Sequence, residues 1–137
     1  MSADFNEIKI VGIDENGIVK DDSFLYAYRL PFILSSRPDD TWVRLFEYAY
    51  YSRSPLGRRK AFVLVDRIVV IMAKDESIGG HRHNLETAVK KANGNYITML
   101  RKEEHQKKLD EERREQELKE QEDTIKKIKE GGKKLKF

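Results

Sequence analysis

The sequence contains no cysteine. Disulfide bonds, zinc sites with thiolate ligands, iron–sulfur clusters and a cysteine nucleophile are therefore excluded. Apolar stretches are also short, and none approaches the roughly 18–20 residues that a membrane-spanning helix needs. No basic segment followed by an apolar one opens the chain, so we expect no secretory signal. These absences are compatible with a reducing cytoplasm, which is the location we expect.

The motifs of common enzyme classes are missing as well. The glycines form neither Gly-x-x-x-x-Gly-Lys-Ser/Thr nor Gly-x-Gly-x-x-Gly, the loops that hold phosphates. Gly-x-Ser-x-Gly is absent, and Ser52 and Ser54 have no identifiable base partner. His81 and His83 are separated by one residue, but no further ligands can be assigned to complete a metal site with them. The sequence predicts no catalytic residue, metal or cofactor, and an enzyme with an unfamiliar site is the less favoured alternative.

Aromatic residues are nearly absent from the last part of the chain, where charge dominates. Twelve of the thirteen Phe, Tyr and Trp residues lie in residues 1–100. Residues 101–137 hold 13 basic and 11 acidic side chains, which is 24 of 37 positions. Such a segment has too little apolar surface to offset the entropy lost in forming its own core. We therefore predict a compact α+β domain in residues 1–100, a charged helical extension in 101–130 and a flexible basic end in 131–137.

Alternating apolar residues predict strands in the first third of the chain. Residues 7–13 alternate in polarity, and Asn16-Gly17 suggests a tight turn after which residues 18–20 return as a hairpin partner. Residues 24–34 are apolar on one face and fairly apolar on the other, which is typical of a central strand. Pro31 lacks an N–H and is instead typical of an edge strand or a bulge. The sequence leaves this conflict open.

Helical spacing of apolar residues follows the strands. Residues 35–40 form a helix-start signal with Ser36 or Arg37 as the N-cap, and apolar residues then recur at spacings of three and four up to Tyr50. The other predicted elements are a hairpin of two strands, 61–65 and 68–72, a short helical turn at 75–77 interrupted by Gly79-Gly80, and a second amphipathic helix that includes Leu85–Met99.

This order of elements predicts the fold class. The order β-β-β-α-β-β-α favours an antiparallel sheet with two helices on one face, an α+β fold. Hairpin connections dominate, which argues against a doubly wound parallel sheet. The last helix is expected to extend into a long charged C-terminal helix.

The charged extension has helix-stabilising pairs but little apolar periodicity. Six acid-to-base pairs at i and i+4 run along it, beginning with Glu103–Lys107, and no Pro or Gly occurs before Gly131. Leu109 and Leu118 lie on opposite faces of a helix, so the heptad pattern of a coiled coil is weak. The alternatives are a solvated rod, a helix that binds a partner or forms a homo-oligomer, and a disordered tail.

Basic residues gather between Trp42 and Arg67, where six of them accompany two acids. Arginine neutralises phosphates and stacks on planar groups, and exposed aromatic residues stack bases. An acidic protein surface would fit this cluster equally well, and the bland alternative is that the tyrosines are core and the arginines solubilise a loop. Three lysines close the chain as a second basic group. The candidate partner- or nucleic-acid-binding residues are Arg44, Tyr51, Arg53, Arg58, Arg59, Lys60, Arg67, Lys133, Lys134 and Lys136.

These features predict a small, non-catalytic interaction protein. It would dock onto a macromolecular partner through its basic surface and its charged C-terminal helix, and a protein partner is the first expectation. The alternative is a nucleic-acid-binding accessory protein that uses the basic cluster from Arg53 to Lys60 together with the three terminal lysines.

Overall fold

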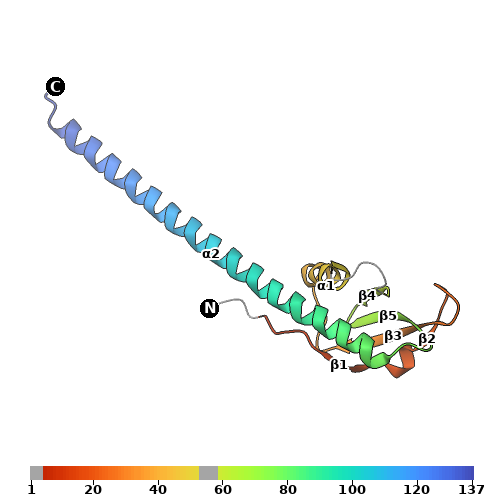
Figure 1. Cartoon of the computed structure of the whole chain (residues 1–137). Coiled ribbons are helices and arrows are strands. Elements are labelled where there is room, and N and C mark those ends of the chain that lie inside the picture. The colour runs from red at the N-terminus through yellow and green to blue at the C-terminus, as the bar shows by residue number, and fades with distance from the viewer. Residues whose placement is uncertain (1–4, 53–58) are drawn as a thin grey trace. The chain divides into compact units, whose positions relative to one another are not determined.

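The computed structural model describes residues 5–52 and 59–137 (Figure 1). These residues form two compact units, which we call the head (the described residues through Thr98) and the tail (Met99–Phe137). The predicted domain boundaries stay a prediction. The strands are β1 (Ile10–Ile13), β2 (Val19–Asp21), β3 (Ala27–Leu34), β4 (Ala61–Leu64) and β5 (Arg67–Ala73), and the helices are α1 (Asp40–Ser52) and α2 (Ile78–Lys133).

The five strands form one antiparallel sheet with β3 at its centre. Strand β3 pairs with β5 on one side, and β5 pairs with β4 to form the predicted hairpin. On its other side β3 pairs with β2 near its beginning and with β1 near its end. The strands β1 and β2 are therefore two pieces of one interrupted edge, and the predicted hairpin between them is wrong. The α+β class and the order of elements are confirmed.

The interruption of this edge explains how Pro31 occupies a central strand. The Pro31 carbonyl accepts the Asp14 N–H at 3.0 Å, and in an antiparallel pair the N–H of the same residue would point to the same side. On that side a 3-10 turn (Glu15–Gly17) follows β1, and the Asp14 carbonyl accepts the Gly17 N–H at 3.0 Å. The Gly17 N–H of the turn thus replaces the donor that Pro31 lacks. This explains both why the apolar pattern indicates a central strand and why the proline indicates an irregular edge.

We predict that Gly17→Ala destabilises the head, because the new Cβ would lie 2.7 Å from Cγ of Pro31. The turn would have to move away from the proline ring, at a cost of about 1–3 kcal/mol. Urea denaturation measures the free energy of unfolding, and Gly12→Ala is the matched control, since its Cβ would meet only Ile33 Cδ1, at 4.0 Å. Equal losses of stability in the two variants would contradict the close packing of turn and proline.

Both helices cover the same face of the sheet, as predicted (Figure 1). Alternate residues of β3 and β5 point into one core, where α1 and α2 each present an apolar stripe. The central core residues are Leu30, Phe32 and Leu34 of β3, Ile68, Val70 and Met72 of β5, Trp42, Phe46, Ala49 and Tyr50 of α1, and Leu85, Ala88, Val89 and Ala92 of α2. This packing supplies the apolar burial that stabilises the head.

Helix α1 begins later than expected. Asp39 Oδ1 accepts the Trp42 N–H at 2.8 Å, so Asp39 is the N-cap, and the predictions of Ser36 or Arg37 are wrong. The other carboxylate oxygen of Asp39 accepts the hydroxyl of Tyr96 on α2. The cap therefore also ties the start of α1 to α2.

Helix α2 is longer than expected at both ends. Ser77 Oγ accepts the Gly80 N–H at 3.0 Å, so Ser77 caps α2 and Gly79-Gly80 lies within its first turn. The predicted interruption at these glycines is wrong. The helix also continues through Gly131-Gly132 to Lys133, where we expected a flexible end to have begun.

Asn93 on α2 connects three segments of the head. Its Oδ1 accepts the Ile8 N–H at 3.2 Å and the Trp42 indole N–H at 2.9 Å, and its Nδ2 donates to the Ile8 carbonyl at 2.8 Å. All three residues are buried. Buried polar groups need hydrogen-bond partners, and the Asn93 amide supplies them to a chain segment that enters the core before β1.

We predict that Asn93→Leu destabilises the head by about 3 kcal/mol, because two backbone groups and one indole N–H lose their partners. Trp42 is the sole tryptophan, and its fluorescence follows urea unfolding directly. Asn95→Leu, at a partly exposed position of the same helix, is the control. An Asn93→Leu protein as stable as the control would show that these bonds contribute nothing.

Candidate binding surfaces

The structure distributes the predicted basic residues over several places. Arg53 and Arg58 lie outside the described residues. Arg44 is exposed on α1, and Lys60 is exposed just before β4. Arg67 begins β5 and pairs with the end of β4, so it lies at the opposite end of the hairpin from Lys60. The described members therefore do not form one continuous cluster.

Arg59 is held within the head by Glu76. Its Nε lies 3.0 Å from both carboxylate oxygens of Glu76, and its Cζ lies 4.5 Å from the centre of the Phe24 ring. Glu76 Oε1 also accepts the Ala73 N–H at 2.7 Å and lies 3.3 Å from His81 Nε2. Burial opposes ionisation of Glu76, but the Ala73, Arg59 and His81 contacts outweigh it and lower its pKa. One carboxylate thus joins the approach to β4, the end of β5 and the start of α2.

Two more of the candidate binding residues have partners in the fold. The Tyr51 hydroxyl donates to the Ala61 carbonyl and accepts the Ala61 N–H, both at 2.9 Å, which ties α1 to the start of β4. Arg67 Nη1 lies 2.7 Å from Asp66 Oδ1, and its Nε lies 3.5 Å from Asp14 Oδ2. In the sequence, Tyr51 and Arg67 resemble part of a binding pattern. In the structure, their contacts instead connect elements of the fold.

The sheet face that the helices leave uncovered carries a second, smaller apolar cluster. Arg59 and Lys60 lie above its aromatic rings, with Lys60 Nζ 5.8 Å from the centre of the Phe62 ring. A cation over an aromatic face is attracted by the ring quadrupole. The cluster consists of Ala27, Val69 and Ile71, with Phe24 and Phe62 packed against them. Two of the candidate basic residues therefore lie over aromatic rings of their own chain, Arg59 closely and Lys60 at a longer distance that leaves it exposed.

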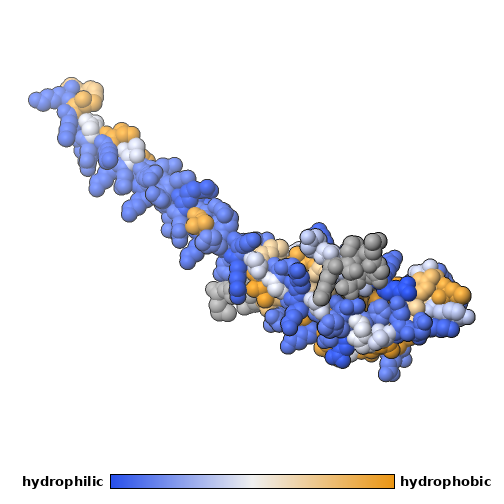
Figure 2. All heavy atoms as spheres, viewed as in Figure 1, coloured by the Kyte–Doolittle hydropathy of each residue, from blue (hydrophilic) through white to orange (hydrophobic). Residues whose placement is uncertain are grey.

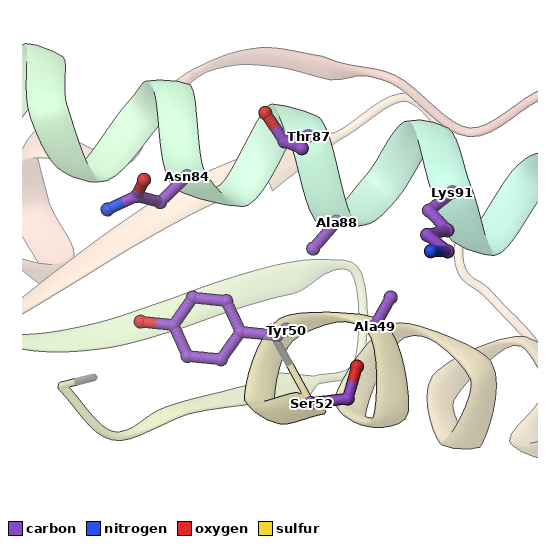
Figure 3. A pocket seen from close by; sticks show the side chains of 7 residues that line it. All are labelled: Ala49, Tyr50, Ser52, Asn84, Thr87, Ala88 and Lys91. Atoms are coloured by element: carbon purple, nitrogen blue, oxygen red, sulfur yellow. The ribbon is translucent and has the colours of Figure 1, made fainter. Parts of the chain in front are cut away.

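A cleft of about 390 Å³ opens between α1 and α2 (Figure 3). Ala49 and Ala88 point into it from the two helices, and these small side chains leave the space open. The hydroxyls of Tyr50 and Thr87 donate to backbone carbonyls of the head. Among the described residues that line the cleft, Lys91 is the only charged one, so these residues assemble no acid–base pair. The other described residues of the lining are Ser52 and Asn84.

Metal ligation and membrane insertion find no support in the described part of the chain. Its His, Asp and Glu side chains form no group of three or more that could hold a metal ion. His81 is directed to Glu76, and His83 is exposed. None of the described helices combines the length and the apolar character needed to cross a bilayer.

The tail is a helix whose side chains are almost all exposed. From Arg101 onward only Asp110 is partly buried, because it lies 3.6 Å from Arg113 and accepts a hydrogen bond from Gln106 at 3.1 Å. Figure 2 shows the tail as a largely hydrophilic surface interrupted by separate apolar patches. Lys133 ends the helix, and Lys134 and Lys136 are exposed beyond it. The exposed aliphatic residues are Leu109, Leu118, Ile125, Ile128 and Leu135.

Comparison with known proteins adds no relative: the chain matches no protein family, no curated protein and no solved structure. Function is therefore inferred from the head and the tail themselves. Sequence reasoning missed Glu76 and Asn93 as organising residues. Asn93 left a signal, since it is a polar residue beside Ala92 on the apolar stripe of α2. Glu76 left none, because its partners come from separate segments of the chain.

Asp21 is a second carboxylate that the head holds in its ionised form. Its Oδ2 accepts the hydroxyl and the N–H of Ser23, the latter at 3.0 Å, and its Oδ1 accepts Arg29 Nε at 2.9 Å. The Ser23 hydroxyl is the main cause, followed by Arg29, and together they lower the pKa of Asp21 from 3.8 to about 2. These bonds fix the loop between β2 and β3.

We predict that Asp21 contributes to the loss of stability in acid. Its pKa is lower in the folded than in the unfolded chain, so the stabilisation is complete above pH 3.8 and is lost as the pH falls to about 2. Urea denaturation at a series of pH values should give a shallower decline for Asp21→Asn than for the native protein. Asp22→Asn, at the exposed neighbouring position, is the matched control. Identical declines in the native protein and Asp21→Asn would refute this role.

Proposed function

We propose that this chain is a small, non-catalytic interaction protein of the cytoplasm whose tail is the principal element for binding a protein partner. The observation that carries this proposal is the exposure of the tail. From Arg101 through Lys133 the chain stays helical, yet only Asp110 is even partly buried. The helix that supplies Leu85 and Val89 to the core of the head is the same helix that continues into the tail.

A helix formed before binding lowers the entropy cost of docking. Ordering a flexible segment at an interface consumes part of the interaction energy, whereas a preformed helix has already lost that freedom. The spacing of acids and bases at i and i+4 favours a helix in the tail without any contribution from its aliphatic residues, and Asp110 forms an ion pair with Arg113 one turn away. Those aliphatic residues remain available for a partner, in the manner of helices that present apolar anchors to a groove or to another helix.

The head contributes fewer available contacts to this proposal than its sequence indicates. Arg44 and Lys60 are exposed, whereas Tyr51, Arg59 and Arg67 are engaged with other residues of the head. Binding of nucleic acid through the cluster from Arg53 to Lys60 stays a prediction, and no described contact favours it over a protein partner. The same test can decide between the two.

The test compares two full-length proteins in an affinity pull-down from extract. One has the native sequence, and the other has residues 101–130 permuted so that composition and acid-to-base pairs are kept but Leu118, Ile125 and Ile128 are moved to different faces. In nuclease-treated extract we expect the native protein to retain proteins that the permuted one does not, because the docking face is lost. Circular dichroism checks that both tails are equally helical.

Two outcomes would contradict the proposal. If both proteins retain the same set, the tail does not determine binding. If nuclease treatment abolishes retention by the native protein, the bound species depends on nucleic acid, and the alternative function replaces the first.

A further inference from the structure

Three aliphatic residues of the tail lie on one side of its helix. At about 100° per residue, Leu118, Ile125 and Ile128 fall within an arc of about 80°, and Gln121 lies inside the same arc. Their side chains are 52–68% exposed. They occupy the a and d positions of two heptads, with Leu118 and Ile125 at a and Gln121 and Ile128 at d. We call these four residues the tail seam; Leu109 lies on the opposite side of the helix.

The charge of the tail is divided into two blocks of opposite sign. Residues 110–123 contain eight acidic and three basic side chains, a net charge of −5. Residues 124–137 contain six lysines and one glutamate, a net charge of +5. The blocks have equal length and equal, opposite charge, although the tail as a whole is nearly neutral.

We propose that the tails of two copies of this chain pair as antiparallel helices through the tail seam. This inference rests on the proposed function in that the tail is the binding element, and it names a second copy of the chain as a further partner of the tail. Leu118 of one copy lies against Ile128 of the second copy, and Gln121 lies against Ile125 of the second copy. This register centres the pair on Asp123.

The register set by the seam is also the register that the charges require. An antiparallel pair centred on Asp123 places residues 110–122 of each copy, with a net charge of −4, against residues 124–136 of the second copy, with a net charge of +5. Lys134 and Lys136 of the latter segment lie beyond the end of the helix. The seam and the charge blocks are independent features of the sequence, and both select the same alignment. Complementary potentials of this kind steer association and suppress other alignments.

A parallel pair in the same seam would have the opposite electrostatics. Like blocks would face each other along the whole tail, and Glu117 at a g position would approach Glu122 at an e position of the second copy. In the antiparallel pair e positions face e positions, so Glu115 lies beside Lys129 of the second copy, and Glu122 lies beside Glu122 of the second copy near the centre. The two charge blocks as a whole, rather than each single contact, therefore favour the antiparallel orientation.

The first experiment is sedimentation velocity of the full-length protein over a range of concentrations. We expect a reversible monomer–dimer equilibrium that weakens as salt is raised from about 0.02 to 0.5 M, because screening reduces attraction between exposed charges. Ile125→Gln should raise the dissociation constant at least about tenfold, since both copies lose a seam residue. Leu109→Gln, the same kind of change on the opposite side of the helix, should leave it unchanged.

The second experiment exchanges charges between copies. Glu115→Lys and Lys129→Glu should each weaken self-association, because each places like charges side by side in the dimer. When the two variants are mixed, one lysine meets one glutamate at both contacts, so the mixed dimer should form nearly as well as the native one. A parallel pair would not show this rescue, since it does not bring positions 115 and 129 together.

The third experiment uses the absence of native cysteine. Arg114→Cys and Gly132→Cys lie opposite each other in the proposed register, so a short bismaleimide should cross-link the two variants when they are mixed and neither one alone. Self-cross-linking of either variant would overturn the antiparallel alignment. A purified protein that stays monomeric at all concentrations and salts would overturn self-pairing altogether. That failure is separate from the proposed function, which depends on tail-dependent capture of other proteins from extract.

Discussion

The hydrogen bonds of Asn93 hold together parts of the head that have little else in common along the chain. One amide satisfies both backbone groups of Ile8, 85 residues away, and the indole N–H of Trp42, 51 residues away. Trp42 begins the apolar stripe of α1, and Ile8 belongs to the same core. The apolar core between the helices and the sheet therefore also depends on these polar contacts. A buried N–H or C=O group without a hydrogen-bond partner would lower the free energy of unfolding by about as much as a large apolar contact raises it.

The edge of the sheet that faces away from β5 solves a second constraint. Pro31 in the central strand β3 has no N–H to donate to a neighbouring strand. At this position the neighbouring edge is interrupted by a turn between β1 and β2, so no continuous strand needs that donor. The turn approaches the proline ring so closely that glycine is the residue that fits at position 17. The interruption also shortens β1 and β2, and short edge strands offer little template for pairing with other chains.

Charge has different roles in the two units. In the head, Asp21, Glu76 and Asp39 accept hydrogen bonds that fix loops and helix starts, and Arg29 and Arg59 are the partners of Asp21 and Glu76. In the tail, the spacing of acids and bases favours a helix that has no core beneath it, and their division into blocks gives that helix a direction. The proposed function and the proposed antiparallel pairing both concern the tail, where the charged side chains remain exposed.

The pattern of apolar residues was sufficient to predict the α+β class, the order of elements and the helix stripes such as Leu85, Val89 and Ala92, because these depend on local periodicity, but it left open whether residues 24–34 form a central or an edge strand. Helix caps are local features of the kind that a sequence can indicate. Even so, the cap of α1 was predicted at Ser36 or Arg37 instead of Asp39, and the cap of α2 at Ser77 was missed. The interrupted edge at Pro31, the Asn93 bonds and the engagement of Arg59 by Glu76 required the folded chain. Their partners come from distant segments, and no spacing in the sequence records which donor will meet which acceptor once those segments pack together.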